Sequence, residues 1–290
     1  MDSEQRLAKK IAVPVKIEKI KIGKYDINYV TAGSGKPLLL IHGGNIGWGQ
    51  WYPNIAEFAK HFRVYAIDLV GAGRSSKVDF SKLDLQRDLV DVVSEFIEKK
   101  RLGNFSVVGS SIGGWIALEL TLTKSNVEKL VVVDSIGFAD SIRFADKILS
   151  ITPFAKLLAK TVLTPKRNNK NIEKFLRDVF YKKDLEIWEE FIDYFYDTMK
   201  TSHNLLFISS LSSFFGVRSE FRMKDKLPKI GCGTLVIWGE KDKFMSPAKI
   251  YNNFKLIPNV SVEIIKNAGH IPSIEKSAEF NKLVLKFLRS

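Results

Sequence analysis

The sequence predicts an α/β fold, in which helices cover both faces of a mostly parallel sheet. Three observations predict it: short runs that are apolar throughout, helical patterns between those runs, and one long interruption of the alternation. The chain has 290 residues, of which 45% are hydrophobic and 27% charged. This composition excludes a disordered chain and a disulfide-stapled miniprotein. The length fits one large domain or a domain with a substantial insertion.

The expected strands are of two kinds. Residues 15–22 and 25–30 alternate around Gly23-Lys24, which predicts a hairpin. Most later runs are apolar throughout, as is typical of strands buried on both faces. They span residues 38–41, 63–69, 105–109, 129–134 and 234–239, and a half-alternating run spans 261–266. Helical patterns separate them, the clearest at 83–101, after 109 and at the end of the chain.

The alternation stops once, between Ile136 and Pro228. This segment has no strand-like run, carries amphipathic patterns and holds 15 of the chain's 33 aromatic residues. Such an insertion is a natural cover for a site at the carboxyl edge of the sheet. We therefore predict a core domain of residues 1–135 and 229–290, with a helical cap at 136–228. Most of the rings should form the cap's own core, and a few should line a pocket.

One motif carries chemistry: Gly109-Ser110-Ser111-Ile112-Gly113, between a buried strand and a helical pattern. A nucleophile on a sharp strand-to-helix turn sits in strained dihedrals, with its hydroxyl clear of the sheet. Side chains two residues away on either side would collide, so both positions favour glycine. The motif alone is weak, but its place between strand and helix predicts that Ser111 is a nucleophile.

Two partners for Ser111 follow in the order Ser, Asp, His. Asp242 comes after the run 234–239, and His270 comes after the run 261–266. If the strands are parallel, both residues lie at the same sheet edge as Ser111. This order differs from that of chymotrypsin-type and subtilisin-type enzymes.

With these motifs in place, the sequence resembles the α/β-hydrolase superfamily over nearly its whole length. The matching landmarks, in chain order, are His42-Gly43-Gly44, Asp68 with residues 71–75, the motif at 109–114, residues 239–242 and residues 268–270. The resemblance implies the α/β-hydrolase fold: an eight-stranded, mostly parallel sheet with helices on both faces and an inserted helical cap. It also implies a serine esterase or lipase-like activity.

Carried over to this sequence, the resemblance implies that Ser111 attacks, His270 moves the proton and Asp242 orients the ring. The backbone N–H groups of Gly44 and Ile112 would form the oxyanion hole. Asp134 is the alternative acid, because some superfamily members place the acid after the sixth strand. For His42, Asp68 and Arg74 we expect bracing roles in loops.

Several related chemistries are weighed against ester hydrolysis. Serine at the nucleophile position argues against haloalkane dehalogenases and epoxide hydrolases, which use a carboxylate. Proline iminopeptidases typically continue the His-Gly-Gly motif with Pro-Gly, whereas here Asn45-Ile46 follows His42-Gly43-Gly44. This difference weakens the aminopeptidase interpretation, although Glu189 and Glu190 could bind a substrate amine. Ile271 replaces the tryptophan that usually follows the catalytic histidine of C–C bond hydrolases. These two activities, and a non-catalytic ligand-binding protein, stay open as alternatives.

Charge and cysteine content set the remaining expectations. The net charge is +13, and residues 160–183 are strongly basic, which we interpret as a solvated face rather than a nucleic-acid site. Cys232 is the single cysteine, so an intrachain disulfide is excluded. We expect no cofactor, no metal, no nucleic acid and no integral membrane association. The predicted partner is a small-molecule ester and the predicted location cytoplasmic, while the sequence leaves the oligomeric state open.

Overall fold

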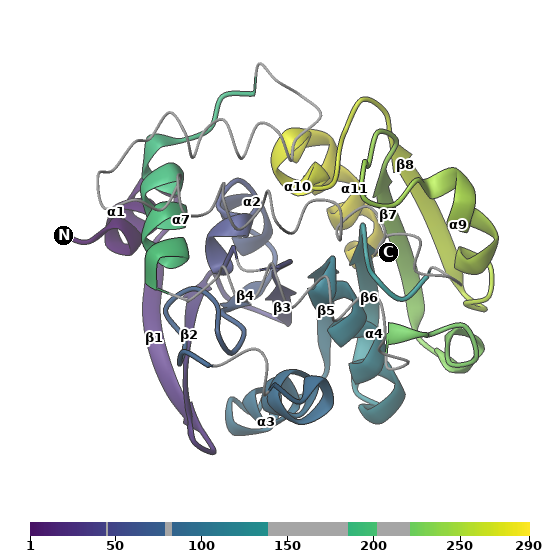
Figure 1. The fold of residues 1–290 in the computed structure, drawn as a ribbon, viewed down its shortest axis with the longest axis horizontal. Helices are drawn as coiled ribbons and strands as arrows, with labels where there is room; N and C mark the ends of the chain where they lie inside the picture. The colour runs from purple at the N-terminus through teal and green to yellow at the C-terminus, as the bar shows by residue number, and fades with distance from the viewer. Residues whose placement is uncertain (45, 79–82, 139–184, 202–220) are drawn as a thin grey trace, which may run out of the picture.

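The structure is a computed structural model that describes residues 1–44, 46–78, 83–138, 185–201 and 221–290, with the side chains of 199–201 excepted (Figure 1). Eight strands form one sheet in the order β1-β2-β4-β3-β5-β6-β7-β8. The pairs β1–β2 and β2–β4 are antiparallel, and every other neighbouring pair is parallel. The predicted eight-stranded, mostly parallel sheet is confirmed.

Each expected strand is present, with ends shifted by at most a few residues. The strands are β1 (Val15–Ile22), β2 (Tyr25–Ala32), β3 (Pro37–Ile41), β4 (Arg63–Ile67), β5 (Phe105–Ser110), β6 (Val127–Val133), β7 (Gly233–Gly239) and β8 (Val260–Ile265). The helices are α1 (Ser3–Lys10), α2 (Ile55–Ala59), α3 (Val92–Lys99), α4 (Ile112–Thr123), α7 (Glu189–Thr201), α9 (Pro247–Phe254), α10 (Pro272–Glu275) and α11 (Ser277–Arg289). Short turns of helix lie at η1 (Trp48–Trp51), η3 (Gln86–Asp91) and η5 (Leu227–Lys229).

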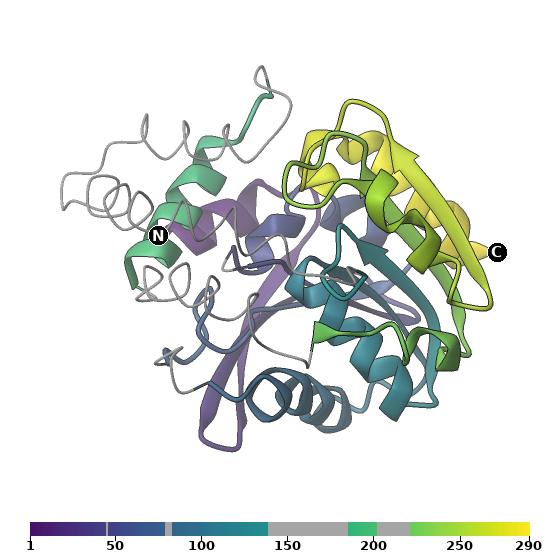
Figure 2. The same ribbon diagram turned by 45° about the vertical axis from the view of Figure 1, so that its right-hand side comes forward.

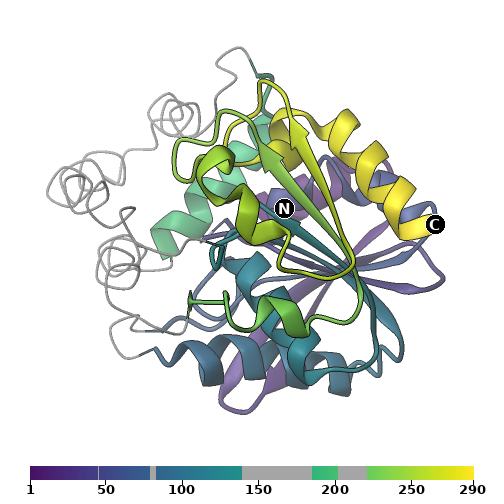
Figure 3. The same cartoon turned by 90° about the vertical axis from the view of Figure 1, so that its right-hand side faces the viewer.

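Helices cover both faces of the sheet because the central strands are apolar on both sides. Along β3, Leu39 and Ile41 join a core with α3, α4 and α9, whereas Leu38 and Leu40 join a second core with α1, α2 and α11. Figure 3 shows the twisted strands between these two layers. The alternation follows from the two-residue period of a strand. This sandwich holds the carboxyl ends of the strands in fixed positions.

The N-terminal helix was not predicted. Charged residues dominate its sequence, yet Asp2 accepts a hydrogen bond from Gln5 N while the Gln5 side chain accepts one from Asp2 N. This reciprocal capping box is readable in the sequence as an acidic residue three positions before a glutamine. α1 packs against α7, the helix of the predicted cap segment that the structure describes (Figure 2).

The predicted helix at 83–101 forms in two parts. It starts with the wide turns of η3 and continues as α3, which ends at Lys99. Buried Asp88 lies within η3 and accepts hydrogen bonds from Tyr25 Oη (2.8 Å) and Asp84 N.

Most of the predicted cap, 136–228, lies outside the described residues, as does the basic stretch 160–183. The described parts are 136–138, the segment with α7, and 221–228. Within the described part of the chain, no helix combines the length and apolar character needed to cross a membrane.

Candidate active site

Four polar residues stand at the carboxyl ends of four neighbouring parallel strands. Ser111 follows β5, Asp134 follows β6, Asp242 lies shortly after β7, and His270 lies in the loop after β8. The sheet order β5-β6-β7-β8 and the parallel pairing bring these strand ends to one edge. In open α/β sheets this edge is where ligands bind.

The turn at Ser111 has the strained backbone that the motif predicts. Its φ of 53° and ψ of −116° lie outside the regions that non-glycine residues normally occupy. A Cβ at Gly109 would lie 2.2 Å from Gly113 O, and one at Gly113 would lie 2.4 Å from Ile41 O. Both positions therefore exclude a side chain, because the opposing atoms are backbone. The two glycines let the strand and helix pack tightly enough to hold Ser111 in this turn.

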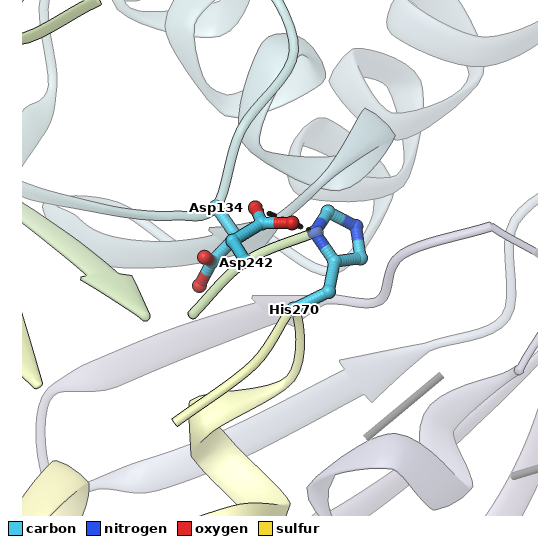
Figure 4. A group of neighbouring side chains, drawn as sticks. All are labelled: Asp134, Asp242 and His270. Atoms are coloured by element: carbon cyan, nitrogen blue, oxygen red, sulfur yellow. Dashed lines mark hydrogen bonds and ion pairs between the residues drawn. The ribbon is translucent and has the colours of Figure 1, made fainter. Parts of the chain in front are cut away.

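Asp242 and His270 are joined directly. His270 Nδ1 lies 3.0 Å from Asp242 Oδ2, and the Asp242 side chain is fully buried (Figure 4). Burial would raise the pKa of Asp242, but the His270 ring and the backbone N–H groups of Met245 and Phe244 outweigh burial and lower it. Asp242 is therefore a stable carboxylate. Since Nδ1 faces this carboxylate, the other ring nitrogen, Nε2, is left for proton transfer.

Two aromatic residues that the sequence analysis did not single out complete this contact. Trp238 Nε1 donates to Asp242 Oδ2 (3.1 Å), and the Phe244 ring lies 4.7 Å from the centre of the His270 ring. They fix the carboxylate and one face of the imidazole. Trp238 lies on β7 just before Asp242, and Phe244 follows Asp242 by two residues. Their closeness to Asp242 in the sequence was the one sign that they could contact the site.

The structure shows no hydrogen bond between Ser111 and His270 within the residues it describes. Catalytic hydrogen bonds are often long before substrate binds.

Asp134, the alternative acid, lies beside Asp242. It is completely buried, and its Oδ1 accepts a hydrogen bond from Gly239 N (3.0 Å). One oxygen of Asp134, one oxygen of Asp242 and a ring nitrogen of His270 lie within 4.8 Å of one another. His270 Nδ1 donates its hydrogen bond to Asp242. Asp134 therefore lies behind the Asp–His pair.

The same three groups could be considered as metal ligands. However, His270 Nδ1 and Asp242 Oδ2 bond to each other, and both Asp242 oxygens accept N–H groups. A cation would have to displace these bonds, so the arrangement fits an orienting acid and base better than a metal site.

The predicted oxyanion loop lies next to Ser111. A Cβ at Gly43 would be 3.2 Å from Ser111 Cβ, so the loop backbone closely approaches Ser111. Gly43 N donates to the buried Gln50 Oε1 (2.7 Å), a brace that the sequence analysis missed. Gln50 is the polar residue of an otherwise aromatic and glycine-rich stretch, Trp48–Trp51, and that was its only signal. Gly44 follows Gly43, and Ile112 is the first residue of α4, where helical N–H groups lack intrahelical partners.

The expected bracing roles of His42 and Asp68 are confirmed. His42 is fully buried; its Nε2 accepts a hydrogen bond from Leu69 N (3.0 Å) and its Nδ1 donates to Gly43 O. Burial lowers its pKa to about 4, so the ring is neutral. Asp68 accepts hydrogen bonds from Trp48 N and Arg74 N. Both residues tie loops near the oxyanion loop to the sheet.

The comparisons with known proteins agree on the fold, and the relatives' names describe several hydrolase activities. A family model described as alpha/beta hydrolase fold matches residues 36–277. A 2-hydroxy-6-oxo-6-(2'-aminophenyl)hexa-2,4-dienoic acid hydrolase from Metapseudomonas resinovorans is 26% identical over 93% of this chain and 89% of its own. The carboxylesterase YbfK from Bacillus subtilis is 24% identical over 92% of this chain and 85% of its own. The crystal structure of a bacterial membrane phospholipase A superposes with a TM-score of 0.81 at 22% identity, over 99% of this chain and 89% of the other.

Proposed function

This chain belongs to the α/β-hydrolase fold family, and we propose that it hydrolyses carboxylic esters through an acyl-enzyme on Ser111. His270 is the proposed acid and base, and Asp242 is the proposed orienting acid. The observation that carries the proposal is the hydrogen bond of His270 Nδ1 to a buried carboxylate, at the sheet edge that holds a strained serine. A carboxylate on Nδ1 fixes the tautomer in which Nε2 can accept a proton.

The proposed reaction runs in two halves. His270 Nε2 takes the hydroxyl proton while Ser111 Oγ attacks the ester carbonyl carbon. The N–H groups of Gly44 and Ile112 hold the resulting oxyanion, and the start of α4 adds the positive end of a helix dipole. His270 returns the proton to the leaving alcohol. A water activated by His270 then cleaves the acyl-enzyme and regenerates Ser111.

The segment 136–228 is the proposed cover of the site and would set its specificity. Its aromatic richness favours substrates with apolar acyl or aromatic groups. The proposed substrate class is a small-molecule ester that carries such a group.

A second candidate is C–C bond hydrolysis, which the Metapseudomonas relative favours because the substrate in its name has no ester or amide bond to hydrolyse. Ile271 after His270 weighs against it, since C–C hydrolases of this superfamily usually carry tryptophan there. An aminopeptidase is less favoured, because Glu190 pairs with Lys10 at 2.7 Å.

A substrate panel separates these candidates. The purified protein is assayed with p-nitrophenyl esters from acetate to laurate, and with the dienoic acid in the name of the Metapseudomonas relative. We expect ester turnover with a preferred chain length, and labelling of Ser111 by a fluorophosphonate probe. Turnover of the dienoic acid alone would establish the second candidate. Failure of both substrates and of the probe would favour a ligand-binding protein on the same fold.

A further inference from the structure

Asp134, which lies behind the Asp242–His270 pair, has a hydrogen-bonding pattern that the proposed reaction does not explain. Asp134 is fully buried, yet only one of its two oxygens has a hydrogen-bond donor. Oδ1 accepts from Gly239 N, whereas Oδ2 is a buried atom without a partner among the described residues. An unsatisfied buried carboxylate oxygen is costly, so native structures normally give it a proton or a donor.

The groups facing Asp134 are mostly acidic. Asp242 comes from the loop after β7, Glu275 from α10, and His270 from the loop after β8. Glu275 is itself buried and accepts hydrogen bonds from Gly269 N and Ile271 N. Asp242 and Glu275 thus both act electrostatically on Asp134. Three negative charges in this buried space would strongly repel one another.

The distribution of donors decides which carboxyl is protonated. Asp242 accepts hydrogen bonds from Phe244 N (2.7 Å), Met245 N (3.2 Å) and Trp238 Nε1, and it faces His270. Asp134 has the single donor Gly239 N. A carboxylate with several donors is stabilised in its charged form, and a carboxyl with few is not. Asp134 is the member better suited to hold a proton.

We propose that Asp134 is a neutral carboxylic acid whose hydroxyl faces Asp242, and that it acts on His270 as a positioning residue through Asp242. Its Oδ2 then becomes a donor, which removes the unsatisfied atom. The proton also lets Asp242 keep its charge beside a second carboxyl. The inference rests on the proposed function, because it takes Asp242 and His270 as the working pair.

Two further observations agree with this assignment. Burial, followed by the charge of Asp242, raises the pKa of Asp134 well above its ordinary value. Asp134 also has a φ of 42°, in the left-handed region that aspartate tolerates only as single residues. The chain therefore holds this carboxyl against Asp242 with a locally strained backbone.

Infrared difference spectroscopy tests the proton directly. At neutral pH, the spectrum of the wild-type protein minus that of Asp134→Asn should contain the carbonyl stretch of a protonated carboxylic acid. Exposed Asp26 gives the matched control, because Asp26→Asn should yield no such band. Absence of the band from the Asp134 difference would mean that this carboxyl is ionised, and would overturn the proposal.

Kinetics with a p-nitrophenyl ester test the positioning role. We expect Asp134→Ala to lower kcat on the order of tenfold, as loss of a group supporting an active-site ligand often does. Asp134→Asn should lose clearly less, because its amide can donate to Asp242 while its oxygen accepts from Gly239 N. Equal losses in the two variants would contradict a donating role.

The pH profile of kcat/KM gives a further check. Asparagine replaces one neutral group by another, so the midpoint of the acid limb should not move in Asp134→Asn. A shift of that limb to lower pH would show that Asp134 carries a charge, and would contradict the proposal. The infrared measurement does not require turnover. If Asp134 is protonated in a protein that cleaves no ester, the proposed function is refuted, while the assignment of a proton to Asp134 beside Asp242 still holds.

Discussion

Two pairs of buried carboxyl groups show how buried acids serve different ends in one molecule. Glu4 belongs to α1 and Asp68 accepts a hydrogen bond from Tyr194 of α7, whereas Asp134 and Asp242 follow β6 and β7, the elements labelled in Figure 1. In each pair, burial and the neighbouring acid raise the pKa of one member, to about 7 for Asp68 and well above the ordinary value for Asp134.

The pairs differ in their hydrogen-bond donors. Asn28 Nδ2 donates to both Glu4 Oε1 and Asp68 Oδ2 and so bridges the first pair. Asp68 also accepts from Trp48 N (2.6 Å) and Arg74 N (2.8 Å). Asp134 accepts from a single N–H group. Hydrogen-bond donors surround Asp68 and make it a structural brace. Asp134 has one such donor, so the charges of its neighbours affect it more strongly.

The largest expected effect is that of replacing Ser111, the proposed nucleophile. Ser111→Ala should lower kcat for p-nitrophenyl esters by about 10⁴-fold or more, because no other described hydroxyl occupies the strained turn. Thermal unfolding should hardly change, since alanine keeps the Cβ and loses one partly exposed hydroxyl. The neighbouring Ser110→Ala is the control, and it should retain turnover. Loss of activity in the Ser110 variant alone would move the nucleophile by one position.

Asp242→Asn should have the next largest effect, a fall in kcat of about 10²- to 10³-fold through loss of the preferred ring tautomer. The loss should be smaller than for Ser111→Ala, because Asp134 no longer faces a charge and can ionise. The double variant Asp134→Asn/Asp242→Asn should then fall further. Activity in the Asp242 variant equal to that of the wild type would show that the acid is misassigned.

The first pair should respond in stability rather than in rate. Asp68→Asn places an NH₂ group against N–H donors, and should lower the free energy of unfolding by about 2–4 kcal/mol. Asp134→Asn should cost less than about 1 kcal/mol, because the amide oxygen of asparagine can still accept the hydrogen bond from Gly239 N. Urea denaturation of the two variants measures the difference. A larger loss in the Asp134 variant would reverse the comparison.

The same pair should also shape the dependence of stability on pH. The pKa of Asp68 is raised from 3.8 to about 7 on folding, so the folded state holds its proton more tightly. This contribution is fully present below about pH 4 and is lost as the pH rises through about 7. Asp68→Asn should therefore flatten the stability curve over this range in denaturation experiments at several pH values. An unchanged slope would mean that Asp68 is ionised throughout.

The contrast between the pairs also separates what the sequence could predict from what it could not. The strands and the order Ser111, Asp242, His270 follow from local patterns, because buried runs and the turn glycines are visible in short windows. The burial of Glu4 and the missing donor at Asp134 depend on residues far apart in the chain, whereas the brace from Gln50 to Gly43 closes a local loop that has no sequence motif. The donors of Asp242 other than His270 lie within four residues of it, but no local window shows that Gly239 N is the single donor to Asp134. Much of the segment 136–228 lies outside the described residues, so its predicted role as a cap stays a prediction.

The smallest expected effect concerns the ion pairs that join α1 to α7. Arg6 binds Asp193 at 2.7 Å, with the two side chains 38% and 10% exposed. Because Arg6 is partly solvated, Arg6→Ala should lower the free energy of unfolding by no more than about 1 kcal/mol, and added salt should shrink the loss. The more exposed Lys36, paired with Glu128, supplies the control, and Lys36→Ala should cost still less. A loss in the Arg6 variant as large as that of Asp68→Asn would show that α1 braces the structure mainly through its ion pairs, and not through the buried bonds of Glu4.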